Sequence, residues 1–411
     1  MIGGMASKHV LFRALPLMLA FVLGLGLPRS FLLLYAIEGV SCFLAWRQQR
    51  IAPTSILLCS TITLLGFGVT YVALRLSWGV WVPVMDHVQP VLAAALLPAL
   101  GLMAGWCLQH LGGPLLSRRA MTWMIIAYGF GALSYVLISL GLTHSPWWDW
   151  LQPLSQSVEV PWGSEHSLNM RSVEQRGYIM LACLPSIFYL KPVHQGRHRL
   201  LAAALMISAL LACVATWSFQ SRIGMLVLLL SSLPWICSLK FLSKRVYTLV
   251  FLFAASIFII ASGRFCDERV FLQSNFLANV WQAPWGGRLI RFDYADCNPA
   301  ITNHFGSFVG SNASSPHNVL LDIYNDAGIL PFALMLASVS LIGIVVLRWF
   351  FLTYLAGGWD WHMAVRWAMF SALLVQFFAQ PFMYSDQLMF SLAFFFLGMM
   401  MAEAFGAPQS T

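Results

Sequence analysis

Long apolar segments recur along the chain and are separated by short polar stretches. A membrane-spanning helix needs about 20 mostly apolar residues, because the hydrocarbon layer is about 30 Å thick. The segments lack the strict alternation of apolar and polar residues that is typical of a membrane β-barrel. The pattern therefore predicts an all-α polytopic membrane protein of about twelve spans. They lie at about 9–28, 30–46, 53–77, 89–111, 121–143, 177–191, 200–219, 223–241, 247–262, 327–350, 364–383 and 387–405.

The composition excludes a water-soluble domain. Of the 411 residues, 59% are hydrophobic and 9% charged, and the mean hydropathy is +0.76. Soluble domains carry about a quarter charged residues. No linker or repeat divides the chain, so we expect one membrane-embedded domain over residues 1–411.

The basic residues predict an orientation. Cytoplasmic loops of membrane proteins carry an excess of Lys and Arg. With both termini in the cytoplasm, six basic groups fall inside, and the net charge of +8 needs no nucleic-acid partner. These groups are Lys8/Arg13, Arg47/Arg50, Arg118/Arg119, Lys191/Arg197/Arg199, Lys240/Lys244/Arg245 and Arg348/Arg366.

Two long loops, at about 144–176 and 263–326, are predicted on the outer side. The end of the first, Leu168 to Arg176, fits a short amphipathic helix. The second contains Cys266 and Cys297, and an oxidising compartment would let them pair. Two free thiols are the alternative.

The second loop closes with a predicted helix. A serine followed by proline, as in Ser315-Pro316, is typical of a helix start. The helix would hold His317 in its first turn and end near Gly328, where the next span begins. The positive end of the helix dipole would keep the imidazole neutral and available as a base. The alternative is an interfacial histidine that only bonds a backbone carbonyl.

Arginines on the outer side are candidate phosphate ligands, because a guanidinium holds phosphate through two parallel hydrogen bonds. Arg222 lies at the outer end of the predicted seventh span, Arg75 at that of the third, and Arg288 within the second loop. Snorkelling to the headgroups is the alternative for Arg222, and pairing with Asp293 or Asp296 is the alternative for Arg288.

Three other features carry a hypothesis. Glu38 lies in the middle of the second span, where an ionisable group marks either a functional site or a buried hydrogen bond to a neighbouring helix. Asp386, in an outer turn, either orients a base or an arginine or caps the last helix. Asp293-x-x-Asp296 fits ion pairing with nearby arginines better than a metal site, so we infer no metal and no cofactor.

These residues resemble a known signature. His317-Asn318, followed after nine residues by Gly328, resembles that of the O-antigen ligase and polymerase superfamily. Ser221-Arg222 resembles that family's Ser-Arg after a central helix, and Gly287-Arg288 its loop arginine. The layout of spans and loops also fits. One departure is Pro331, where the family usually has a second glycine.

The resemblance implies a fold and an activity. It implies a GT-C-type, metal-independent, inverting glycosyltransferase in the bacterial inner membrane, active on the periplasmic side. The donor would be an O-antigen glycan on undecaprenyl diphosphate, and the acceptor the lipid A–core oligosaccharide. His317 would be the general base, with Arg288 and Arg222 on the diphosphate. Further candidate substrate-binding residues are Arg75, Arg291, Asn318, Asp386 and Arg176.

Three alternatives stay open. An O-antigen polymerase uses the same donor but extends a second lipid-linked glycan, and an oligosaccharyltransferase would modify proteins. A lipid or solute transporter belongs to a different class, and it would place polar groups near the membrane midplane. Glu38 is the one clear midplane charge among the predicted spans.

Overall fold

A computed structural model of the chain describes mainly residues 30–48, 54–77, 94–111, 222–238, 268–287, 316–379 and 387–406, with a few shorter pieces. This part is mostly helical. Its helices of twelve residues or more are α2 (Ser30–Gln48), α3 (Ser55–Ser77), helix 94–111, α7 (Arg222–Ser238), α9 (Glu268–Asn279), α12 (Ile329–Leu355), α13 (Trp361–Ala379) and α15 (Gln387–Gly406).

Shorter elements lie between these helices. They are α11 (Val319–Ala327), the 3₁₀ turn η4 (Val280–Gln282), and two antiparallel pairs of two-residue strands. The pairs are β1 (Ser157–Val158) with β2 (Leu168–Asn169), and β3 (Phe292–Asp293) with β4 (Asn312–Ala313). The helix expected from Leu168 is therefore wrong at its first two residues, because their backbone pairs with β1 instead.

Four described helices are long and apolar enough to cross a membrane: Ser55–Arg75, Ala94–Leu111, Ile329–Leu355 and Trp361–Ala379. The helices α2, α7 and α15 also match predicted spans to within a few residues. The predicted spans at about 9–28, 121–143 and 247–262, and nearly all of 177–191 and 200–219, lie outside the described residues. The all-α membrane architecture is thus confirmed in its coarse form.

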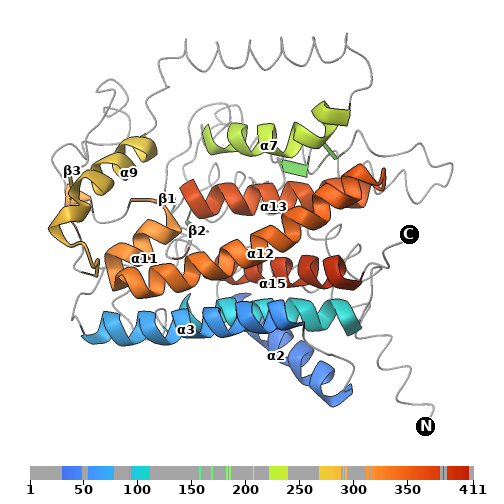
Figure 1. The fold of residues 1–411 in the computed structure, drawn as a ribbon, viewed down its shortest axis with the longest axis horizontal. Coiled ribbons are helices and arrows are strands. Elements are labelled where there is room, and N and C mark those ends of the chain that lie inside the picture. Colours follow the sequence, from blue (N-terminus) through green and yellow to red (C-terminus); the bar gives the residue numbers. More distant parts are fainter. Residues whose placement is uncertain are drawn as a thin grey trace.

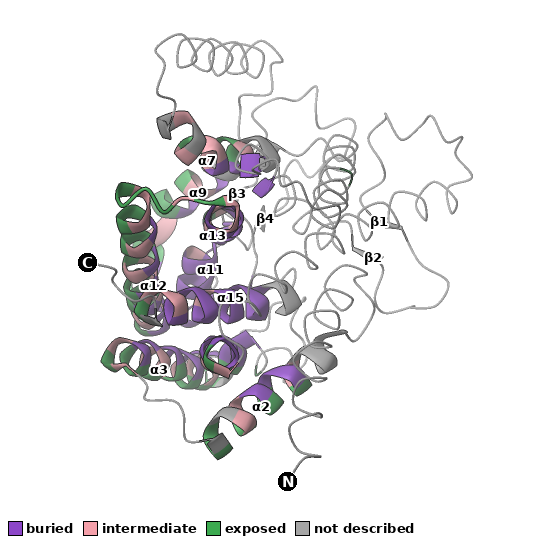
Figure 2. Cartoon of the chain, turned by 90° about the vertical axis from the view of Figure 1, so that its right-hand side faces the viewer, coloured by how far each residue is buried: buried purple, intermediate pink, exposed green. Residues whose placement is uncertain are grey.

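The long helices lie alongside one another, and α9 and α11 gather at one end of the bundle (Figure 1). The helices α3 and α12 are antiparallel. The Ser338 hydroxyl lies 2.6 Å from that of Thr63, and Arg75, twelve residues later in α3, contacts Asp326 just before α12. Burial is concentrated where the helices face one another, and the outward sides of α3 and α12 are exposed (Figure 2).

Glycines let three helices approach very closely. A Cβ on Gly105 would lie 1.9 Å from the carbonyl oxygen of Phe395 in α15, and one on Gly398 would lie 2.1 Å from that of Leu102. A Cβ on Gly68 of α3 would lie 2.5 Å from the Ala95 oxygen. Helix 94–111 is therefore held between α3 and α15 by backbone-to-backbone contact. Such small-residue contacts hold helices together in lipid, where the hydrophobic effect gives no preference for packing.

Candidate functional site

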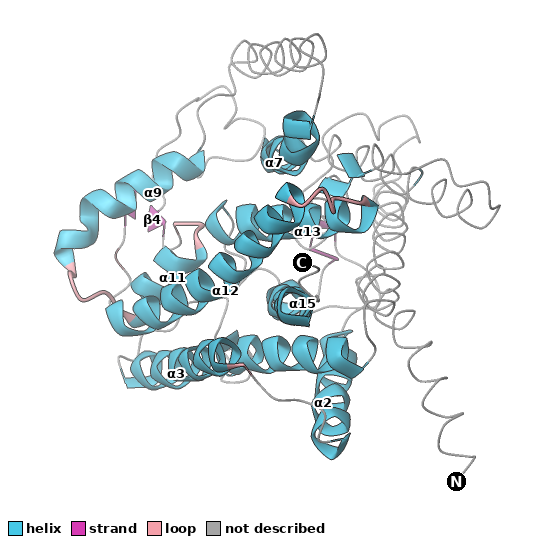
Figure 3. Cartoon of the chain, turned by 45° about the vertical axis from the view of Figure 1, so that its right-hand side comes forward, coloured by secondary structure: helices cyan, strands magenta, loops and turns pink. Residues whose placement is uncertain are grey.

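The candidate site lies at one end of the bundle, where α11 packs against α3, α12 and α13; Figure 3 shows α11 beside α12 and above α3. The Asn318 side chain donates to the Phe378 carbonyl of α13 (3.1 Å), and Gln273 of α9 donates to the same carbonyl (3.1 Å). At the other end of α11, Asp326 contacts Arg75 of α3. These contacts bring together segments that are far apart in the sequence.

Asn318, and not a serine, is the N-cap of α11. Its Oδ1 accepts hydrogen bonds from the backbone N–H groups of Leu320 (3.0 Å) and Leu321 (3.2 Å). An N-cap side chain satisfies donors that have no partner within the helix. Because Asn318 Nδ2 also donates to α13, this one side chain caps the first turn of α11 and fixes the position of that turn against α13. The predicted helix end at Gly328 is confirmed.

His317 therefore lies outside the helix, one residue before the cap, and the expectation that it occupies the first turn is wrong. Its φ of +56° makes it the one non-glycine residue with a left-handed backbone among those described. Histidine adopts this region more readily than most residues, but it is still uncommon. Such backbones cluster at functional sites, where the surrounding structure enforces them. The side chain is half-buried.

The far end of α11 is held by an ion pair that the sequence did not suggest. Arg75 Nη1 lies 2.7 Å from Asp326 Oδ2, and the Tyr71 hydroxyl donates to the same oxygen over 3.2 Å. The two charged side chains are 1% and 4% exposed. Arg75 therefore stabilises the position of α11 against α3. Its predicted role in substrate binding stays a prediction.

Residues 283–287 and Ile290 are attached to α11 through Tyr324 and Asn325. The Tyr324 carbonyl accepts from Gly287 N (3.0 Å), and its hydroxyl donates to the Pro284 carbonyl (2.7 Å). The Asn325 side chain accepts from the backbone N–H of Ile290. Burial raises the pKa of the Tyr324 phenol, which favours its protonated, donating form.

Glycine is required at this junction. Gly286 and Gly287 have φ values of +69° and +74°. A Cβ on Gly286 would lie 2.3 Å from the Tyr324 carbonyl oxygen. Only a residue without a side chain allows this turn to approach α11 so closely. The resemblance drew attention to Gly287-Arg288 for its arginine, whereas the structure adds a packing reason for the glycines before it.

Several predicted residues fall outside the described part. For Arg222 the structure describes only the backbone, at the start of α7. Wholly outside the described residues are Arg288, Arg291, Arg176, Asp386, Cys266 and Cys297. The predicted roles of these residues and of Arg222 remain predictions.

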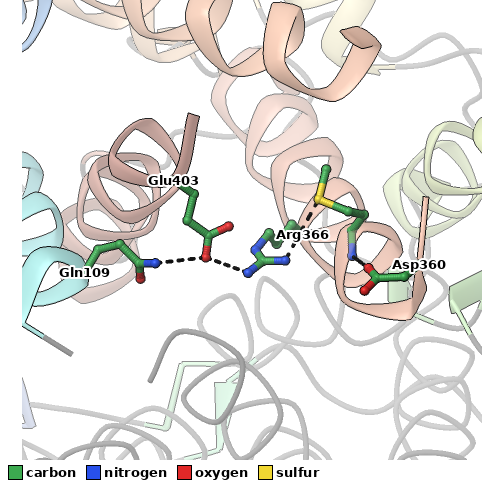
Figure 4. Close-up of polar contacts among 5 residues, drawn as sticks. Gln109, Asp360, Arg366 and Glu403 are labelled. Atoms are coloured by element: carbon green, nitrogen blue, oxygen red, sulfur yellow. Dashed lines mark hydrogen bonds and ion pairs between the residues drawn. The ribbon is translucent and has the colours of Figure 1, made fainter. Parts of the chain in front are cut away.

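A second buried ion pair lies at the opposite end of the bundle, in residues that sequence reasoning had not linked. Glu403 Oε1 of α15 accepts from Arg366 Nη2 of α13 (2.5 Å) and from Gln109 Nε2 of helix 94–111 (3.2 Å). Figure 4 shows Gln109 and Arg366 approaching this carboxylate from opposite sides. Arg366, expected as a cytoplasmic flanking charge, is only 4% exposed. Three helices are therefore tied together far from His317.

Glu38 makes the buried hydrogen bond that was one of its two interpretations. Its side chain is 0% exposed, and Oε1 accepts from the Ser391 hydroxyl of α15 over 3.1 Å. Among the described residues, no group of three or more His, Cys, Asp or Glu side chains could hold a metal ion.

No protein-family model matches the chain, and no curated protein matches it. The class of the protein therefore rests on its own residues. In the part of the chain that the structure describes, they define a mostly helical protein with apolar helices long enough to cross a membrane, and with a short helix, α11, anchored across one end of the bundle.

Proposed function

We propose that this chain is a membrane-embedded glycosyltransferase of the O-antigen ligase type. It transfers a glycan from undecaprenyl diphosphate to the lipid A–core oligosaccharide at the periplasmic face of the bacterial inner membrane. The observation that carries the proposal is the left-handed backbone of His317, directly before a cap that bonds both α11 and α13. A histidine in this uncommon conformation, within the signature that the sequence resembles, is a strong candidate for the reacting base.

The reaction needs one base and a stabilised leaving group. An acceptor hydroxyl oxygen attacks the anomeric carbon of the donor sugar, and His317 takes the hydroxyl proton. The bond between that carbon and the diphosphate oxygen breaks on the opposite face, so the configuration inverts. The electron pair leaves with undecaprenyl diphosphate, and the base releases its proton to water. General-base catalysis typically contributes about 10²–10⁴-fold.

Arginines hold the diphosphate in this mechanism and stabilise the charge that grows on it as it leaves. Arg288 follows Gly287, which is anchored to α11, and precedes the second anchor, Ile290, by two residues. This attachment supports Arg288 as the principal ligand. Arg222, at the start of α7, is the second. Arg291, Arg176 and Asp386 remain further candidates.

The test is a transfer assay with purified protein, an undecaprenyl-diphosphate-linked glycan and lipid A–core, resolved on a gel. Glycan should move onto the core with the wild type, and His317→Ala and Arg288→Ala should abolish transfer. His110→Ala and Arg47→Ala remove the same side-chain types at exposed positions elsewhere and should be neutral. If both site variants transferred at the wild-type rate, the assignment would be wrong.

The alternatives give different products. Longer lipid-linked glycans with unmodified core would identify an O-antigen polymerase, and a glycosylated protein acceptor would identify an oligosaccharyltransferase. For a transporter, Glu38→Gln should abolish uptake in proteoliposomes. A ligase should keep its activity in this variant, because glutamine retains the oxygen that accepts from Ser391.

A further inference from the structure

The segment that comprises α9, η4 and the turn after them exposes three large apolar side chains. Leu272 and Phe276 are buried in a small core with Tyr324. Other large apolar residues of the same segment are exposed instead. Leu277, Trp281 and Trp285 are 53%, 85% and 74% exposed. They recur at intervals of four residues, which places the first two on one side of the helical segment formed by α9 and η4.

This apolar surface continues onto a membrane-spanning helix. The Trp285 carbonyl accepts the backbone N–H of Ile329, the first residue of α12, over 2.9 Å. Ile329 and Leu330 are themselves exposed, as are Ile344 and Phe351 further along α12. Trp285 thus lies at the point where the outward, apolar side of this helix begins.

We propose that Leu277, Trp281, Trp285, Ile329 and Leu330 form a bilayer-contacting surface, with α9 and η4 lying in the headgroup layer on the α11 side. Tryptophan is enriched at this depth, because its ring is apolar while its N–H can bond water or headgroups. Apolar patches of this kind on a water-exposed loop are uncommon unless they meet a partner. Continuity with α12 identifies that partner as lipid. The inference is independent of the proposed transfer reaction.

The surface also sets the depth of α11. The chain from Trp285 continues directly into Gly286 and Gly287, which pack against the Tyr324 carbonyl. An anchored α9 would therefore hold the start of α12 and the whole of α11 at the lipid–water boundary. A lipid-linked phosphate lies at this level in any bilayer.

Site-specific photocrosslinking tests the proposal in the full-length protein. Trp281 or Trp285 is replaced by p-benzoylphenylalanine, and the protein is irradiated in vesicles of phosphatidylethanolamine and phosphatidylglycerol that contain a clickable phospholipid. Ile344, exposed in the middle of α12, is the positive control. Gln282, which is exposed next to Trp281 but polar, is the matched negative control. Size-exclusion profiles and the Ile344 adduct in a double-labelled chain show that each variant is folded.

We expect lipid adducts at positions 281 and 285 severalfold above those at 282 and comparable to those at 344. Adducts at 344 alone would overturn the proposal, because α9 would then face water. Adducts at 281 and 285 to an added clickable oligosaccharide in place of the phospholipid would overturn it as well, since the exposed rings would then be a stacking surface for sugars.

Discussion

The ion pair between Arg75 and Asp326 allows a direct test of how α11 is held. Arg75→Met keeps a long side chain but removes the counter-charge of a carboxylate that is 4% exposed. Breaking a buried pair typically costs about 3–5 kcal/mol, because the remaining charge stays desolvated. Since about 1.4 kcal/mol corresponds to a factor of ten, α11 should open about a hundredfold to a few thousandfold more often.

Hydrogen–deuterium exchange in lipid nanodiscs measures this opening on peptides that cover α11. The double variant Arg75→Met/Asp326→Leu should recover most of the protection, because apolar replacement of a buried pair is often neutral. Arg47→Met, an exposed arginine of α2, is the matched control, and protection of α12 shows that the bundle stays folded. Unchanged exchange of α11 in Arg75→Met, or a double variant as unprotected as the single one, would refute the argument.

Substitutions at three further positions, with control variants, test other contacts. Asn318→Ala removes the cap of α11 and should cost about 1–2 kcal/mol in its exchange protection, whereas Asn318→Ser should cost clearly less. Gly105→Leu should remove the monodisperse peak of the protein on size exclusion. Gly343→Leu should keep that peak, because no heavy atom lies within 4 Å of the added Cβ. Equal profiles of the two variants would contradict the role of close packing. Glu403→Gln removes the anion that faces Arg366 and should lower the melting temperature in detergent, and an unchanged value would mean that the pair contributes little.

Much of the architecture was predictable because membrane spans are specified locally. Twenty consecutive apolar residues identify a helix without knowledge of its neighbours, and α3, α12 and α15 match their predicted ranges closely. Gly328 was also predictable, since it separates a short amphipathic helix from a long apolar one. The helix α9 was missed, because its twelve residues mix polar and apolar positions within a loop.

The contacts around the candidate site were not predictable, because they depend on tertiary structure. Tyr71 and Asp326 are 255 positions apart, and no local pattern links them. The helix start was misplaced because serine and asparagine both cap well, so the choice depends on which side chain also reaches α13. One signal was present and went unused: Gly101 and Gly105 have the spacing of a helix-packing motif in lipid.

The way in which α11 is held bears on how substitutions in this protein should act. A nine-residue helix is marginal by itself, because isolated helices shorter than about 12–15 residues gain too little to offset their nucleation. Its position therefore depends on three attachments: Asn318 to α13 at the start, Asn325 to Ile290, and Asp326 to α3 at the end.

His317 lies directly before the N-cap of this helix. A change in any one of the three attachments should therefore shift the position of its imidazole. If His317 is the base, loss of the distant Arg75 should lower the transfer rate at saturating donor without removing any group that contacts the reacting atoms. A pure phosphate ligand at that position would instead raise the donor concentration needed for half-maximal rate, so the two parameters of the same variant distinguish positioning from binding.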